Sequence, residues 1–308
     1  MNAHAAIPAS LAVDLPALLA VVLATIACGS LGNFLVLRRE SMTGDAIAHA
    51  VLPGLVGGYL VTGTRSPLAM FAGATVAGVA AVLLAGAARR LARIEPGAAL
   101  GVVFTAAFAL GVALLETSGA RQVDLDPDCV LFGSLETLFF VLPRDAHWTA
   151  GVPTPLWTLA AAAAGALLFS LLLERPLVAL AFDRTHALHT GAAPRWLDRA
   201  LLAATSAAVV ASFEAVGTVL AIALVACPAL AAAPFARSAR GQLAGALAIG
   251  TVLATIGYLL AAHADRLLGT RHALHAAGVV AALLALAVPA SHGLRRALRG
   301  RVVSPPPA

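Results

Sequence analysis

Long apolar runs, broken by arginine or proline, divide most of this 308-residue chain into segments of membrane-spanning length. Hydrophobic residues make up 60% of the sequence and charged residues only 11%, and the mean hydropathy is +0.92. A helix of about 20 apolar residues crosses the hydrocarbon layer of a bilayer, where backbone hydrogen bonds must be satisfied within the protein. The pattern predicts one all-α transmembrane bundle over residues 1–308, with about eight or nine spans and some broken or re-entrant segments.

The expected helices coincide with these runs, but two stretches depart from simple spans. Residues 129–142 are apolar and short and contain Gly133 and Glu136, which favours a re-entrant or membrane-edge segment. Residues 199–230 have almost no loop at Glu214, so we expect two half-depth helices that meet there. The full set of expected helices lies near 16–37, 45–62, 67–88, 98–116, 154–174, 199–213, 215–230, 243–262 and 272–290.

The arginines predict the orientation of the bundle. The chain has no lysine, so its net charge of +5 includes 20 arginines. Arginine is enriched in the cytoplasmic loops of membrane proteins, which places the N-terminus outside and the C-terminus inside, with a flexible tail at 302–308. This charge lies beside anionic lipid rather than on a nucleic-acid surface. No basic segment of a signal peptide precedes the first apolar run, so we expect no cleaved leader. The arginine clusters fall at 38–39, 89–93, 175–199, 237–240 and 295–301.

Missing motifs exclude several kinds of chemistry. A nucleotide-binding P-loop requires a lysine, and the chain has none. The Gly-x-Ser-x-Gly motif of serine hydrolases is also absent from the sequence. Cys28, Cys129 and Cys227 are far apart in apolar surroundings, which is typical of buried thiols. We therefore expect no catalytic residues, and any energy source must be another chain or an ion gradient.

Residues 38–54, RRESMTGDAIAHAVLPG, place Asp45 and His49 four positions apart at the edge of an apolar run. Residues at i and i+4 share a helix face, and one hard oxygen with one borderline nitrogen suits a divalent transition metal. Pro53 and Gly54 follow, and we expect them to break the helix and free backbone carbonyls. The alternative is structural: Asp45 caps the helix and His49 is a hydrogen-bonded core residue.

Glu214, at the expected helix break, is a third candidate for contact with a metal. An ionisable residue at membrane depth indicates a functional site by default. It either lines a transport path or has a buried hydrogen-bonding or capping role. The sequence leaves both roles open.

Two segments are candidates for a cytoplasmic surface that binds a partner. Residues 181–198 are expected to form a short amphipathic helix after Asp183 that ends at Gly191. Residues 229–241 follow Pro228, and they form either a short interfacial helix that docks in a partner's groove or a plain positive loop. The residues that we expect to contact the partner there are Pro228, Phe235, Arg237 and Arg240.

The 38–54 segment resembles the signature of the manganese/zinc/iron permease family of bacterial ABC importers, ABC-3 type. That signature has an arginine followed by Gly-Asp-Ala-x-x-His-Ala-x-x-Pro-Gly. The resemblance extends from about residue 15 to residue 290, through segments similar to the family at 95–114, 123–138, 182–191 and 214–232. The chain departs from the family at Ala48, where a serine is usual, at Pro96-Gly97, where Asp-Thr is usual, and after Pro228, where the usual Ala-Ala-Thr-Ala is missing.

The resemblance implies an inner-membrane permease subunit that works as a homodimer or with a second permease. Its partners would be two cytoplasmic ATPase subunits and a periplasmic protein that delivers Zn²⁺, Mn²⁺ or Fe²⁺, the first two favoured, with no permanently bound cofactor. Asp45 and His49 would lie on the metal path, 229–240 would form the main coupling helix, and 182–191 would be a secondary contact. Glu214 stands where an uncharged polar residue is expected, so the resemblance implies no role for it.

Two rival functions use the same residues differently. An intramembrane enzyme would place Asp45, His49 and Glu214 around a catalytic metal, and it would need a third strong ligand and an activated water. A permease for metal chelates or siderophores would have a wide apolar cavity instead of an ionic constriction.

Overall fold

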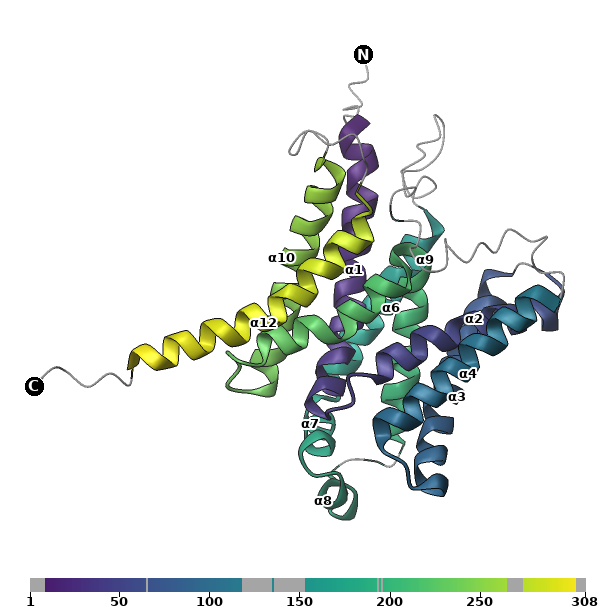
Figure 1. Cartoon of the computed structure of the whole chain (residues 1–308), viewed down its shortest axis with the longest axis horizontal. Helices are drawn as coiled ribbons and strands as arrows, with labels where there is room; N and C mark the ends of the chain where they lie inside the picture. Colours follow the sequence, from purple (N-terminus) through teal and green to yellow (C-terminus); the bar gives the residue numbers. More distant parts are fainter. Residues whose placement is uncertain are drawn as a thin grey trace, which may run out of the picture.

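The computed structural model describes residues 9–64, 66–117, 135, 153–192, 194, 196–264 and 274–302. Within these residues every regular element is a helix, and eight of the helices are long and apolar enough to cross a membrane. This confirms the predicted all-α polytopic bundle, which Figure 1 shows. The re-entrant segment expected at 129–142 lies outside the described residues, apart from Leu135.

The helices follow the expected apolar runs closely. Proline begins α3 and α4, since its fixed φ and missing N–H suit a first helical turn. Gly63 ends α2 in the left-handed region, with φ 62°, and donates its N–H to the Tyr59 carbonyl at 2.8 Å. The helices are α1 Ala9–Leu37, α2 Thr43–Thr62, α3 Pro67–Ala92, α4 Pro96–Thr117, α6 Thr154–Leu172, α7 Glu174–Phe182, α8 Arg184–His189, α9 Leu197–Ala232, α10 Ala239–Ala262 and α12 Ala276–Val302.

The helices form two groups that meet along α9 (Figure 1). In one group α2, α3 and α4 pack on one another, and in the other α1 contacts α6 and α10 while α10 contacts α12. The α2–α3 contact is close because it is made by glycines: a Cβ on Gly54 would lie 2.5 Å from Ala74 Cα, and one on Gly58 would lie 2.5 Å from the Ala69 carbonyl oxygen. Small residues of this kind let helix backbones approach in lipid.

The predicted break of α2 at Pro53 is wrong, since the helix continues through Pro53 to Thr62. The proline ring packs on α4, where Gly111 leaves room for it: a Cβ on Gly111 would lie 2.8 Å from Pro53 Cδ. Proline has no N–H, so the carbonyl of His49 receives no helical hydrogen bond from position 53. The helical hydrogen bond to the His49 carbonyl is therefore lost, as expected, but α2 does not break.

α9 has 36 residues, far more than the roughly 20 that a span requires. Its helical path is interrupted at Gly217, where φ is 77° and ψ is 170°, a conformation that is essentially restricted to glycine. Beyond this kink the second half of α9 runs back toward the start of α10 (Figure 1). The predicted pair of helices is therefore present, but they meet three residues later than Glu214, and the first of them, 197–216, has the length of a full span and not of a half-depth helix.

Ion pairs place both ends of α9 on the same side of the bundle. Asp198, in the first turn of α9, pairs with Arg184 of α8. Arg240, in the first turn of α10, pairs with Glu174 of α7. We call this side, which also carries Arg38, the arginine-rich end. It fits the cytoplasmic orientation expected from the sequence.

Candidate functional site

Asp45 and His49 lie on one face of α2, within its first two turns. The N-cap of α2 is Met42, and no side chain caps the helix, so the capping alternative for Asp45 is wrong. His49 Nε2 lies 3.4 Å from Asp45 Oδ1. The two side chains are 28% and 33% exposed, so neither is a sealed core group. The structure thus brings one carboxylate and one imidazole together on one helix face, both partly exposed.

Two phenylalanines of α4 hold the ring of His49. Phe104 stacks on it with ring centroids 5.0 Å apart, and Phe108 meets it edge-on at 5.7 Å. Phe104, Phe108 and Gly111 follow helical spacing along α4, so one stripe of α4 packs along the His49–Pro53 face of α2. Sequence reasoning missed both phenylalanines, because α4 is apolar all along and its pattern does not single out any face.

The pair supplies two protein donors, which is fewer than a resident metal requires. Zinc sites hold the ion with three or four protein ligands. In the part of the chain that the structure describes, no group of three or more His, Cys, Asp or Glu side chains could hold a metal ion. Among these residues, the intramembrane enzyme therefore lacks the third strong ligand that it needs.

Glu214 is exposed on α9, three residues before the kink. Its neighbour Phe213 packs with Val51 of α2, and successive helix residues point in different directions, so Glu214 does not share that contact. It does not join Asp45 and His49 in a cluster of three donors among the described side chains. Its predicted contact with metal stays a prediction.

The short helix expected after Asp183 is present as α8. Asp183 is its N-cap, and the Asp183 carboxylate accepts a hydrogen bond from the His186 backbone N–H at 2.9 Å. The chain turns just beyond it at Gly191, with φ 73°. Phe182, before the helix, is 78% exposed, and Trp196, after it, is 55% exposed. Exposed aromatic residues thus lie on both sides of the capped helix α8, at the arginine-rich end.

Residues 229–241 do not form a separate helix, and their expected contact with a partner stays a prediction. α9 continues through the buried Pro228 to Ala232, and α10 begins at Ala239. Between them, Ser238 caps α10 by accepting the Gly241 backbone N–H at 3.0 Å. Phe235 and Arg237 are exposed in this loop, whereas Arg240 is engaged with Glu174.

Sequence comparison decides the family. The ABC 3 transport family matches residues 11–289. The chain belongs to the ABC 3 transport family. This confirms the resemblance seen in the 38–54 segment, and together with the eight spanning helices it makes the chain a multi-pass protein of the bacterial inner membrane.

Named transport proteins and a solved structure are among the proteins to which the chain is similar. It is 36% identical over 210 residues to the zinc transport system membrane protein TroD of Treponema pallidum, and 34% identical over 212 residues to the manganese transport system membrane protein MntC of Halalkalibacterium halodurans. These matches cover 68% and 69% of this chain but 56% and 66% of the two relatives, less than two thirds of their length. The fold is that of PsaBC from Streptococcus pneumoniae in complex with Fab, with a TM-score of 0.72, 23% identity and 90% of each chain covered.

Proposed function

We propose that this protein is the permease subunit of an ABC importer for a divalent transition metal, with zinc or manganese as its cargo. The observation that carries the proposal is the Asp45–His49 pair, a partly exposed oxygen and nitrogen donor on a membrane helix of an ABC 3 family member. The names of its relatives, which are zinc and manganese transport system membrane proteins, support the choice of cargo.

A site of two donors per chain suits transport better than storage. An ion must be held strongly enough to enter and weakly enough to leave. The Asp45 carboxylate and the His49 imidazole would replace part of the hydration shell of the metal, with His49 fixed by Phe104 and Phe108. A second copy of the chain would bring a second pair, and four donors make a complete tetrahedral set. Both copies would then share one path, which Glu214 could line from α9.

The partner ATPase would dock on the arginine-rich end. α8 is the capped helix that projects there, and Phe182 and Trp196 flank it. Residues 182–191, expected from the sequence as a secondary contact, would therefore make the main contact with the ATPase. Phe235 and Arg237 would form a second, looser contact in the loop before α10. A periplasmic protein would deliver metal at the opposite end. ATP hydrolysis would thus belong to the partner and not to this chain.

The test is metal accumulation in a strain that lacks this protein and is complemented with the wild type, Asp45→Ala, His49→Ala or Glu214→Gln. We expect the first two variants to abolish accumulation of zinc or manganese, because each removes half of the donors, and the third to reduce it less. His292→Ala is the matched control, since it removes an exposed histidine near the end of α12. Normal accumulation by Asp45→Ala and His49→Ala at normal membrane levels would refute the site.

A further inference from the structure

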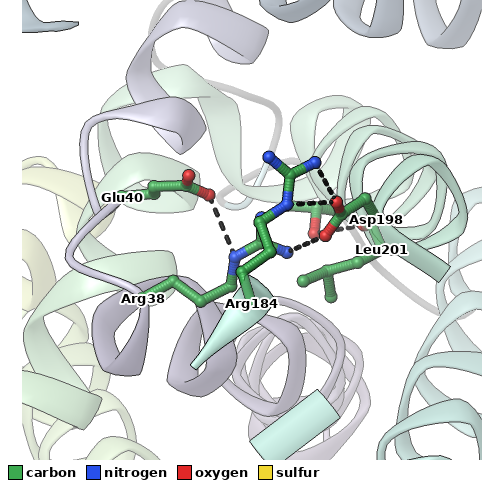
Figure 2. Close-up of polar contacts among 6 residues, drawn as sticks. Arg38, Glu40, Arg184, Asp198 and Leu201 are labelled. Carbon is green, nitrogen blue, oxygen red and sulfur yellow. Dashed lines mark hydrogen bonds and ion pairs between the residues drawn. The ribbon is translucent and has the colours of Figure 1, made fainter. Parts of the chain in front are cut away.

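A cluster of four charged side chains joins three segments of the chain at the arginine-rich end. Figure 2 shows Arg38 between Glu40 and Asp198, and Arg184 reaching the second carboxylate oxygen of Asp198. Arg38 Nε lies 3.1 Å from Glu40 Oε2, and Arg38 Nη1 lies 3.0 Å from Asp198 Oδ1. Arg184 Nε donates to Asp198 Oδ2 at 2.9 Å. We call these four residues the Arg38 cluster.

Asp198 is the centre of the cluster because its two oxygens serve different partners. Oδ1 faces Arg38, which directly follows α1, and Oδ2 faces Arg184, which begins α8. The Arg38 and Asp198 side chains are only 10% and 13% exposed, so their attraction is little screened by solvent, in contrast to surface pairs. A single carboxylate therefore connects the exposed helix α8 to the turn between α1 and α2.

That turn is too constrained to absorb a displacement. Arg39 has φ 60°, which is unusual for a residue other than glycine. The Glu40 N–H binds the Leu35 carbonyl at 2.8 Å and the Arg39 N–H binds the Val36 carbonyl at 3.0 Å, so two bonds close the end of α1. A shift of Arg38 is thus expected to move the turn as a unit.

The turn leads directly into the helix that carries the candidate metal site. Gly44, next to Asp45, packs on Val225 of α9: a Cβ there would lie 2.8 Å from Val225 Cγ1. The start of α2 is thus held by the Arg38 cluster on one side and by α9 on the other. A displacement of the cluster is therefore expected to move the start of α2.

We propose that Arg38, Asp198 and Arg184 are positioning residues that transmit movement of α8 to the start of α2 and so to Asp45. The inference rests on the proposed function, in which α8 meets the ATPase and Asp45 meets the metal. It adds the connection between those two surfaces. Glu40 balances the charge of Arg38, so that the cluster contains two acids and two bases.

The chain contains a matched control for this link. Glu174 of α7 pairs with Arg240 of α10 at the same end of the bundle, and Glu174 is 12% exposed, much like Asp198. This pair does not include any residue of α2, of α8 or of the turn before α2. Loss of the pair between Glu174 and Arg240 should therefore lower the stability of the protein somewhat without changing the amount of metal transported per ATP.

The experiment uses the complete transporter, with its ATPase and its periplasmic protein, in proteoliposomes. We expect Arg38→Gln and Asp198→Asn to bind the ATPase and hydrolyse ATP, while Zn²⁺ or Mn²⁺ transported per ATP falls by about tenfold. The double variant Arg38→Gln/Asp198→Asn should fall no further than Asp198→Asn, because both changes break one link. Arg38→Lys, which keeps the charge, should restore part of the ratio. Glu174→Gln should keep the wild-type ratio.

A second measurement separates this inference from the proposed function. Nitroxide labels at the exposed positions Val61 of α2 and Leu260 of α10, in a chain whose three cysteines are replaced by alanine, report the distance between the two helix groups. ATP should change this distance in the wild type and not in Arg38→Gln. The link is refuted if ATP changes the distance in both the wild type and Arg38→Gln, or in neither. It is also refuted if Glu174→Gln lowers the transport ratio as much as Arg38→Gln does. If the distance behaves as expected but the wild type transports no metal, only the proposed function fails.

Discussion

The contact between α1 and α9 makes a sharp prediction about Gly32. A Cβ at this position would lie 1.9 Å from the Val225 carbonyl oxygen, 2.7 Å from its carbonyl carbon and 2.9 Å from its Cα. All three are backbone atoms, so no side-chain rotation can relieve the clash. Since ordinary contacts between such atoms are about 3.5 Å, α1 and α9 must separate by roughly 1.5 Å to accept Gly32→Ala.

The size of the effect follows from two opposing contributions. Alanine normally stabilises a helix interior relative to glycine by roughly 0.5–1 kcal/mol. Overpacking of a core typically costs about 1–3 kcal/mol and occasionally more, and a backbone clash belongs to the severe cases. We expect Gly32→Ala to lower the free energy of unfolding by about 2 kcal/mol or more, the difference between these contributions. Uptake should also fall, because Val225 packs on Gly44, next to Asp45.

The assay is thermal unfolding of the purified protein in detergent, followed by tryptophan fluorescence, together with metal uptake. Gly86→Ala in α3 is the control: it has the same chemistry in a helix interior, and a Cβ there meets nothing within 4 Å. We expect the melting temperature to drop by several degrees for Gly32→Ala and to stay or rise slightly for Gly86→Ala. If both variants unfold at or above the wild-type temperature, the close α1–α9 contact is not real.

Three further changes test single contacts. Asp183→Ala removes the N-cap of α8 and should weaken this helix by about 1 kcal/mol, which is measured as reduced co-purification of the ATPase and restored by Asp183→Asn. Phe104→Ala removes the ring stacked on His49 and should raise the KM for metal by roughly two- to tenfold at an unchanged melting temperature, given the usual strength of such contacts; an unchanged KM would show that His49 needs no support from α4. Tyr258→Phe removes the hydroxyl that donates to Asp14 Oδ1 at 3.1 Å, and it should cost about 1 kcal/mol of stability in thermal unfolding without changing the KM for metal.

The positions of the helices could be predicted because their signals are local. Apolar runs give the spans, and proline and glycine give their limits, as at Pro67, where α3 begins, and Gly63, where α2 ends. The spacing of Asp45 and His49 is also local, since any helix through both places them on one face. Their proximity was therefore predictable, but the orientation of His49 by α4 was not, because it depends on tertiary packing.

The kink in α9 shows how a correct expectation can rest on the wrong residue. The apolar run is too long for one span, so a turn back within 199–230 was required. The charge at Glu214 suggested the point, but a helix accommodates a glutamate without bending. The φ and ψ observed at Gly217 are essentially open only to glycine, so the backbone turns there. Conformational freedom, not polarity, determines the position of the break.

The depth of the candidate site also depends on more than local signals. Asp45 lies in the first turn of α2, directly after the arginines, and by sequence alone it would be at the cytoplasmic edge of the membrane. In the structure the turn between α1 and α2 lies above the lower ends of α3 and α4, and α8 projects further still (Figure 1). Arg38 can lie at this level because Asp198 and Glu40 pair with it. Without these two acids the charge would have to reach water, and the start of α2 would move outward with it. The ion pairs that connect α8 to the turn before α2 are therefore also what allows the face with Asp45 and His49 to begin inside the bundle.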